Sequence, residues 1–371
     1  MQGETRPGYK QTEVGVIPQD WDVARIVDVA AITTGSRNTQ DRIDTGIYPF
    51  FVRSQTVERI NSYSFDGEAV LTAGDGVGTG KIFHYINGKF DLHQRVYQIS
   101  NFSPRLNGFF FYLYFASKFF DRIMSMTAKS SVDSVRREMI ADMLMPLPPP
   151  DEQRAIAAAL ADADALIAAL EGMIAKKRDL KQAAMQHLLT GNTRLPGFSR
   201  EWEVTRLGDL LSVRHGKSQK EVETTGGRYP IFATGGEIGR SDAFLYDKPS
   251  VLIGRKGTID EPRYVDVPFW TIDTLFYTEI SARAVPLFIY YKFLTIDWRS
   301  YNEASGVPSL SSKTIEKIEI DCPEPVEQAA IAEVLSDMDA DLAALEAQAA
   351  KARAVKQGMM QELLTGQVRL V

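Results

Sequence analysis

The chain of 371 residues contains two copies of one sequence pattern, and this internal repeat restricts its possible folds more than any other feature. DWDVARIVDV from Asp20 aligns with EWEVTRLGDL from Glu201, at an offset of 181 residues. Further along, PDEQRAIAAAL from Pro150 aligns with PVEQAAIAEVL from Pro325, at an offset of 175. A register kept over so long a distance predicts one structural unit built twice in tandem.

Each copy divides into a mixed part and a helical part. The mixed parts alternate short β-type runs, such as 69–71 and 251–253, with glycine and asparagine turns, which is typical of compact α/β (α+β) domains. The helical parts follow the segments PLPPP and CPEP and continue without proline to Gly191 and Gly366, which favours a long helix in each. The predicted organisation is an α/β domain at 1–147, a long helix at 148–191, an α/β domain at 192–323 and a long helix at 324–371.

Apolar residues in both helical parts recur at alternating spacings of four and three, which is the a/d pattern of a coiled coil. The positions are Ile156, Leu160, Ala163, Ile167, Leu170 and Ile174 in the first helix and Ile331, Leu335, Met338, Leu342, Leu345 and Ala349 in the second. The alternative is that each helix packs this stripe on its own domain alone. A helix of this length measures about 60 Å, however, whereas a domain of this size is about 35 to 40 Å across.

Much of each helix therefore needs another partner, and the chain connections favour the other helix in an antiparallel arrangement. A parallel arrangement would require the second domain to span the whole length of the first helix, for which it is too small. We expect an antiparallel coiled coil, a pseudo-twofold dumbbell, and a C-terminus close to the start of the first domain.

Composition excludes several classes of protein. The chain is 44% hydrophobic and 24% charged, as is usual for soluble proteins, and its longest apolar run, GFFFYLYFAS from Gly108, is shorter than a membrane span. We expect this run to form a buried helix. The N-terminus has no signal-peptide pattern, which favours a cytoplasmic location without a membrane partner. The single cysteine, Cys322, and four scattered histidines predict neither an internal disulfide nor a metal site.

The net charge of −6, taken alone, argues against a nucleic-acid partner, but its distribution along the chain has to be considered. Residues 1–147 carry 16 basic and 16 acidic side chains, and residues 192–323 carry 17 and 18. Most of the excess of acidic residues therefore lies in the helical parts, and the two α/β domains remain candidates for binding DNA.

Polar and basic residues gather in loops at matching places of the two domains. These residues are mostly arginine, lysine, asparagine, glutamine and serine, the types that contact phosphates and base edges. The alternative is that they form solvated turns without a ligand. This alternative is weaker because both copies show the same clusters. The candidate DNA-contacting residues are Arg37, Asn38, Gln40, Ser54, Gln55, Gly76, Thr79, Lys81, Ser130, Ser131, Arg136 and Arg137 in the first domain, and His215, Lys217, Ser218, Gln219, Thr234, Gly235, Arg255, Lys256, Thr258, Ser309, Ser311, Ser312 and Lys313 in the second.

The stretch LTAGDGVGTGK from Leu71 is rich in glycine but matches neither a Walker loop nor a dinucleotide-binding fingerprint. Its counterpart, LIGRKGTID from Leu252, places Gly257 over Gly76 and Lys256 over Asp75. A nucleotide site would need its glycines and lysine in both copies. We therefore expect a DNA-facing loop in each domain, with Thr79 and Lys81 as contacting groups in the first.

Taken together, these features resemble the specificity subunit of type I restriction–modification enzymes. The resemblance rests on PLPPPDEQRAIAAAL leading into a long helix and on LLTGNTRLPGFSREWEV leading into the second domain. The pairs Glu152–Gln153 and Glu327–Gln328, each followed by a helix ending in LLTG, repeat the same motifs. The resemblance covers essentially the whole chain.

This resemblance implies a division of labour between subunits. Each domain would read one half of a bipartite target in double-stranded DNA. The helices would set the spacing and dock two modification (methyltransferase) subunits, and restriction (motor-nuclease) subunits would complete the complex. The product would be N6-methyladenine on each strand. S-adenosylmethionine, ATP and Mg²⁺ would be bound by the partner subunits, and this chain would hold no cofactor and no catalytic residue.

Two other functions remain open from the sequence. A duplicated protein-binding scaffold could bridge two identical partners without reading DNA, and a self-sufficient methyltransferase could bind its methyl donor at 74–80. The sequence has no amino-methyltransferase motif of the form [DN]-P-P-[YF] and no Walker motif. The paired carboxylates Asp162 and Asp164 lie beside the helix seam, where a solvated face or a subunit contact is favoured over acid–base catalysis.

Overall fold

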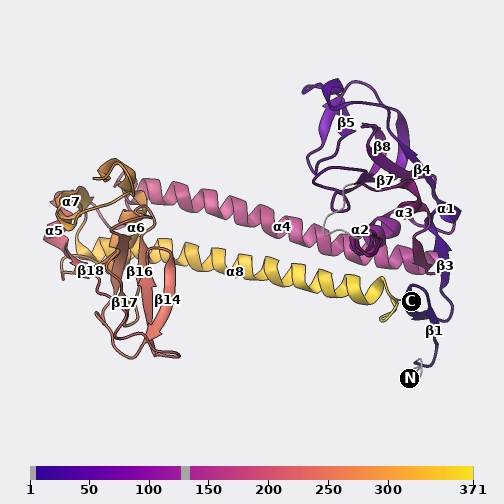
Figure 1. The fold of residues 1–371 in the computed structure, drawn as a ribbon. Coiled ribbons are helices and arrows are strands. Elements are labelled where there is room, and N and C mark those ends of the chain that lie inside the picture. The colour runs from indigo at the N-terminus through magenta and orange to yellow at the C-terminus, as the bar shows by residue number, and fades with distance from the viewer. Residues whose placement is uncertain (1–5, 127–133, 371) are drawn as a thin grey trace. The chain divides into compact units, whose positions relative to one another are not determined.

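The computed structural model describes residues 6–126 and 134–370, which form two compact units. One unit joins Met1–Ala169 to Gln348–Val371, and the other contains Leu170–Ala347. Each unit holds one α/β domain with parts of both long helices (Figure 1). The predicted fold class is confirmed: two α/β domains in tandem, each followed by a long helix, with the helices packed together.

A six-stranded sheet forms the centre of the first domain. Its order is β4 (Ala31–Thr34), β9 (Val96–Ser100), β7 (Phe65–Ala73), β8 (Phe83–Leu92), β5 (Tyr48–Phe51) and β6 (Glu58–Ile60). Neighbours are antiparallel except β8 and β5, which pair in parallel. Helix α2 (Gly108–Ser125) packs against β7 and β8 and buries Phe110, Phe111, Phe115 and Phe119 completely. The apolar run from Gly108 is therefore a core helix, as expected.

Short elements close the first domain around the points where the chain enters and leaves it. Strand β3 (Asp22–Arg25) pairs with β10 (Leu144–Leu147), so entry and exit lie side by side. The remaining elements are the hairpin of β1 (Tyr9–Thr12) and β2 (Gly15–Pro18), the helices α1 (Ile26–Val29) and α3 (Arg137–Ala141), and the 3-10 turn η1 (Thr39–Asp41).

The second domain repeats the strand order of the central sheet of the first domain, with one difference. One sheet contains β12 (Leu211–His215), β18 (Leu275–Ile280), β15 (Ser250–Gly254) and β16 (Arg263–Val265), and another contains β14 (Gly236–Ser241), β13 (Tyr229–Ala233) and β17 (Trp270–Thr271). Strands β16 and β17 together take the place of β8. Pro268 lies between them and cannot donate to a sheet ladder, which accounts for two sheets where the first domain has one.

Apart from the 3-10 turn η2, which follows α6 and has no counterpart among the described residues of the first domain, the other elements of the second domain match the first in order. Strand β11 (Glu203–Arg206) pairs with β19 (Glu319–Cys322) at the entry and exit. The helical elements are α5 (Leu207–Leu210), α6 (Pro286–Thr295), η2 (Trp298–Tyr301) and α7 (Ser312–Lys317). Helix α6 packs on β15 and β16, as α2 does on β7 and β8.

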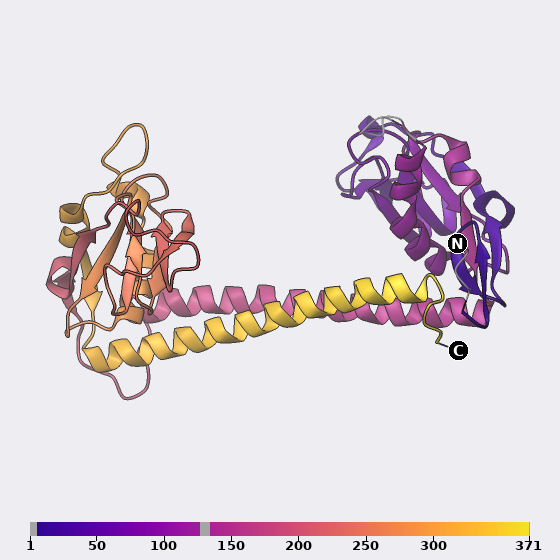
Figure 2. The same cartoon turned by 60° about the horizontal axis from the view of Figure 1, so that its bottom comes forward.

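Helices α4 (Pro150–Leu188) and α8 (Pro325–Leu363) are 39 residues each and start at a proline, which suits the first turn because it needs no amide hydrogen there. They lie side by side (Figures 1 and 2) and are antiparallel within each unit. In the second unit Lys177 pairs with Asp341 and Lys181 with Asp339. In the first unit Leu160 of α4 shares a core with Leu363 of α8.

The twelve seam positions are buried or half-buried throughout. The first two of each helix also belong to the core of the adjacent domain: Ile156 and Leu160 join the α2 core, and Ile331 and Leu335 join the α6 core. Packing on the helix's own domain therefore accounts for the first two turns of each seam. Across residues 6–126 and 134–370, no helix combines the length and apolarity needed to span a bilayer.

Candidate nucleic-acid interface

In the first domain the turn between β8 and β9 joins three of the predicted polar loops. His93 donates its backbone N–H to Phe51 O at the end of β5 (2.9 Å), and Gln94 donates to Arg37 O in the loop after β4 (2.8 Å). Gly74, after β7, donates to Arg95 O (2.8 Å). The loops after β4, β5 and β7 therefore meet at one place, although they are far apart in the sequence.

The fourth polar cluster reaches the same place. Val135 donates its backbone N–H to Gly74 O (2.7 Å), and Asp75 forms a β-bridge with Ser134. Arg136 and Arg137 follow and are exposed. The predicted residues Ser130 and Ser131 lie outside the residues that the structure describes.

The second domain has the same loop junction. Lys217 donates its backbone N–H to Thr271 O (2.8 Å), and Arg255 donates to Thr274 O (2.9 Å). Leu310 in turn donates to Arg255 O (2.9 Å), which joins the fourth cluster to the glycine loop. Gly216 approaches the opposite strand so closely that an added Cβ would lie 2.0 Å from Ile272 O, so only glycine fits there.

Most of the predicted DNA-contacting residues are accessible. The exposed ones are Asn38, Gln40, Gln55, Gly76, Lys81, Arg136, Arg137, His215, Lys217, Ser218, Gly235, Lys256 and Lys313. The half-buried ones are Arg37, Ser54, Gln219, Thr234, Arg255, Thr258, Ser309, Ser311 and Ser312. Whether each contacts DNA remains a prediction.

Several predicted residues have structural partners instead of free polar groups. The Thr79 hydroxyl is buried and donates to Gly76 O (2.6 Å), so it closes the glycine loop and does not point outward. Ser311 caps α7 by accepting from the Thr314 N–H. Arg37 donates through Nε to the buried carboxylate of Asp91 (3.1 Å).

The backbone of the glycine loop is also engaged internally. Thr79 donates its N–H to Gly76 O, and both Lys81 and Ile82 donate to Gly78 O. Phosphate-cradling loops direct their N–H groups at the ligand. These three N–H groups bond within the loop, so the geometry gives no support to a nucleotide or methyl-donor site here.

An ion cluster that the sequence did not reveal lies beside this loop. The Asp75 carboxylate accepts from Arg53 Nη1 (2.9 Å) and from Arg95 Nη1 (3.0 Å). Both arginines are accessible, with 43% and 63% of their side chains exposed. Arg53 adjoins the predicted Ser54, and Arg95 is the first residue of the β-type run 95–99 in the sequence. Basic residues that flank strand ends were therefore the available signal.

His93 connects the cluster to the β8–β9 turn. Burial, followed by the positive charge of Arg53, lowers the pKa of His93 below its ordinary value, so its ring is neutral at neutral pH. The neutral ring accepts the Arg95 backbone N–H at Nδ1 (2.9 Å). The turn that positions Arg95 is thus stabilised without adding another positive charge.

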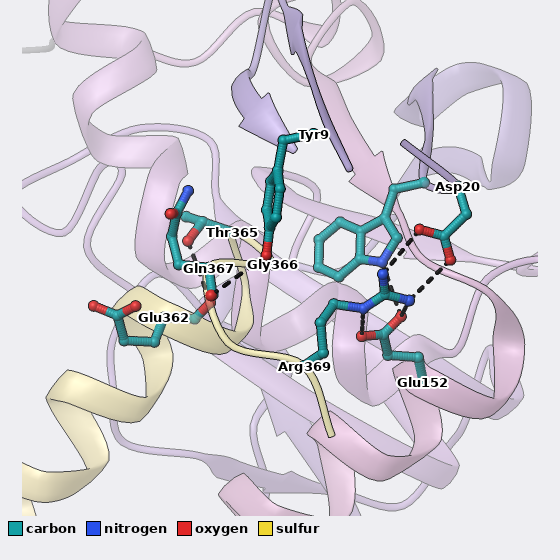
Figure 3. A network of polar contacts seen from close by, with 9 residues as sticks. Tyr9, Asp20, Glu152, Glu362, Thr365, Gly366, Gln367 and Arg369 are labelled. Atoms are coloured by element: carbon teal, nitrogen blue, oxygen red, sulfur yellow. Dashed lines mark hydrogen bonds and ion pairs between the residues drawn. The ribbon is translucent and has the colours of Figure 1, made fainter. Parts of the chain in front are cut away.

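The duplicated Glu–Gln pair has a separate role at the helix ends. Fully buried Glu152 accepts from Trp21 Nε1 (2.8 Å) and from two nitrogens of Arg369 (2.5 and 2.7 Å). Arg369 also donates twice to Asp20 (2.9 and 2.8 Å), as Figure 3 shows. Tyr9 donates its hydroxyl to Gly366 O (2.9 Å). The segment after α8 is thereby attached to the start of the first domain.

The second copy contains the same junction. Glu327 accepts from two nitrogens of Arg194 (both 2.6 Å) and from Trp202 Nε1 (3.2 Å). Gln328 accepts from the Val285 N–H, as Gln153 does from Asn107. The Glu–Gln pair therefore recurs because one residue binds the arginine that follows the other helix and the next residue binds the start of the core helix.

Comparison with known proteins adds family evidence. Residues 18–177 and 199–352 match the family described as the type I restriction modification DNA specificity domain. The chain is 32% identical over 168 residues to the type I restriction enzyme EcoDI specificity subunit of Escherichia coli, which covers 45% of this chain and 36% of that protein. It is 24% identical over 244 residues to the MjaVIII specificity subunit of Methanocaldococcus jannaschii, covering 60% and 56%.

The chain thus spans less than two thirds of the length of either curated relative. A crystal structure of the S subunit of a type I restriction–modification system from M. genitalium has the same fold, with a TM-score of 0.71. That match is 18% identical in sequence and covers 96% of this chain and 98% of the other.

Proposed function

The chain belongs to the type I restriction modification DNA specificity family, and we propose from this premise that each α/β domain reads one half of a bipartite target in double-stranded DNA. The observation that supports this most is the repeated loop junction. In both domains corresponding backbone hydrogen bonds join four polar loops, while the side chains differ, as at half-buried Asp75 and exposed Lys256. Two domains with the same loop backbone but different side chains would be suited to reading two different half-sites.

The long helices would set the distance between the half-sites and, with their flanks, dock two modification subunits. The repeated junctions at Glu152 and Glu327 support this, because they provide two equivalent helix ends for two equivalent partners. Restriction subunits would join the same complex. S-adenosylmethionine, ATP and Mg²⁺ would be bound by those partners, which would form N6-methyladenine on each strand.

Selection from a pool of random duplexes by the chain assembled with its methyltransferase partner tests this function. We expect enrichment of two short motifs separated by a gap of fixed length. Assembly with the partner without enrichment of any gapped motif would instead favour the protein-binding scaffold.

Lys256 provides a residue-level test, because it is exposed in the glycine loop of the second domain. We expect Lys256→Ala to weaken binding to the half-site of that domain, by about 1 to 3 kcal/mol if the contact is to a base. Half-buried Arg255 is the second choice, since its Nη1 donates to Asp273 O (3.2 Å). Competition binding with duplexes mutated in one half at a time measures the effect. A shift in both half-site preferences together would contradict independent reading by the two domains.

A further inference from the structure

We infer that Arg53 and Arg95 read guanine in the half-site of the first domain, and that Asp75 is the residue that positions them. The inference rests on the proposed function and adds to it the base class of one half-site. Arg53 follows β5, Asp75 lies in the loop after β7, and Arg95 directly precedes β9. The β8–β9 turn brings these segments together.

The carboxylate of Asp75 is well placed to hold two guanidinium groups. Its side chain is only 18% exposed, and its backbone is held by the bridge to Ser134 and by the neighbouring bond from Val135 to Gly74. Each of its oxygens accepts from a different arginine, Oδ1 from Arg53 and Oδ2 from Arg95. The two arginines therefore share one fixed anchor.

The contact leaves most of each arginine available to a ligand. Both arginines reach Asp75 through Nη1, so the Nε and Nη2 donors lie outside this contact. A guanidinium fork can donate two parallel hydrogen bonds to guanine O6 and N7, the most common specific contact in the major groove. A fork already oriented by a carboxylate loses less side-chain freedom when it makes those bonds.

Charge favours base reading over simple phosphate binding. One carboxylate between two guanidinium groups removes half of their positive charge, which weakens attraction to the DNA backbone. The carboxylate instead orients the two guanidinium groups, and a fixed orientation matters more for contacts to base edges than for contacts to phosphates. Neutral His93, whose ring accepts the Arg95 backbone N–H, leaves this balance unchanged.

The second domain provides an internal comparison. Lys256 occupies the bridge position of Asp75, since it pairs with Ser309 as Asp75 pairs with Ser134. Thr274 accepts the backbone bond that Arg95 accepts in the first domain. Thr234 follows β13 as Arg53 follows β5, and its hydroxyl lies beside the glycine loop at Gly257. Changes at Asp75 should therefore affect only one half of the target.

The test uses the chain assembled with its methyltransferase partner and selection from random duplexes. Three variants are compared with wild type: Asp75→Asn, which keeps shape but removes the anchoring charge, and Arg53→Lys and Arg95→Lys, which keep charge but remove the fork. Asp66→Asn is the matched control, because Asp66 is exposed on β7 and its ion-pair distance to Lys89 is 4.0 Å.

We expect wild type to select guanine in the half-site that Lys256→Ala leaves unchanged. Each lysine variant should lower the preference for one such guanine by at least about fivefold, and Asp75→Asn should lower it in the same half. The other half-site, and all preferences of Asp66→Asn, should stay as in wild type.

Retained guanine preference in all three variants would overturn the inference, as would loss of preference in both halves together or a first half-site without guanine. If wild type itself selects no gapped motif, the proposed function fails instead. The two failures are therefore distinguishable.

Discussion

At the scale of single residues, the two domains stabilise the same parallel strand pair, β5 with β8 and β13 with β17, through hydrogen bonds of different side chains. Asp91 in β8 pairs in register with Phe50, and Trp270 in β17 pairs with Ile231. The buried Asp91 carboxylate accepts hydrogen bonds from Arg37, Ser62 and Ser64. Trp270 instead donates its indole Nε1 to Lys217 O (2.9 Å). In the first domain the loop after β4 is thereby held to the end of the parallel pair of β5 and β8. In the second domain the loop after β12 is held in the same way to the pair of β13 and β17.

Asp91 makes the first domain sensitive to acid. Burial alone would raise the pKa of its carboxyl, but hydrogen bonds from Ser62, Ser64 and Arg37 outweigh burial and hold the pKa below its ordinary value. A lowered pKa in the folded state stabilises the domain above the pKa of the unfolded state. That stabilisation is lost as the pH falls through the folded-state value.

We therefore expect Asp91→Asn to lower the free energy of unfolding at pH 7 by about 1.5 to 3 kcal/mol, because hydrogen bonds to a charged group are lost. The difference from wild type should begin to shrink below about pH 4, where the unfolded wild-type chain binds a proton at this carboxyl, and should shrink further as the pH falls towards the lower pKa of the folded state. Urea unfolding of both proteins at pH 7 and pH 3 measures this. A difference of the same size at both pH values would contradict the assigned role of the charge.

At the scale of elements, the junctions at Glu152 and Glu327 determine how each helix start is joined to the segment after the other helix. Hydrogen bonds to Asp20 and Glu152 raise the pKa of Arg369 and, in turn, Arg369 lowers the pKa of Asp20. The ionised pair is therefore maintained over the whole neutral range. Trp21 lies against Gly366, where an added Cβ would come within 2.9 Å of its ring.

Arg369→Ala tests the importance of this junction. We expect it to lower the free energy of unfolding of the first unit by about 2 to 4 kcal/mol, because the buried Glu152 carboxylate would lose its cation. Arg194→Ala should have a comparable effect on the second unit, where Glu327 is the carboxylate. Thermal unfolding with hydrogen exchange of each unit measures both.

The matched control for these two variants is Arg25→Ala, since Arg25 forms an exposed pair with Asp28. Solvent screens such an exposed pair, so its removal should change the stability little. If Arg369→Ala were as mild as this control, the junction would have no structural importance.

At the scale of the whole molecule, we propose that helix length determines the gap between half-sites. Helix pairing within the units, such as Asp164 with Lys356 and Asp339 with Lys181, identifies positions near Ala169 and Ala350 as opposite each other. Inserting four helical residues at both places adds about 6 Å, equivalent to about two base pairs. We expect the selected gap to lengthen while both motifs keep their bases. Changed bases at an unchanged gap would contradict a spacer role.

Much of the fold could be predicted because it depends on local pattern. The repeat, the α/β composition of each domain and the proline-started helices follow from spacing and propensity within short windows. The loops proposed as DNA contacts could also be located, since glycine and polar residues mark strand ends. Their joining at one turn could not be predicted, because it depends on how the strands pair.

The sequence by itself determined the tandem repeat, the two long helices and the places of the polar loops, since these depend on residues close together in the chain. Only the tertiary structure decided that Asp75 holds Arg53 and Arg95, that Thr79 faces inward, and that Glu152 binds Arg369, 217 residues further on. The physical reason is that an ion pair or a buried hydrogen bond depends on which distant segments a sheet or helix pair brings within about 3 Å. The local sequence pattern does not show which distant segments will come together.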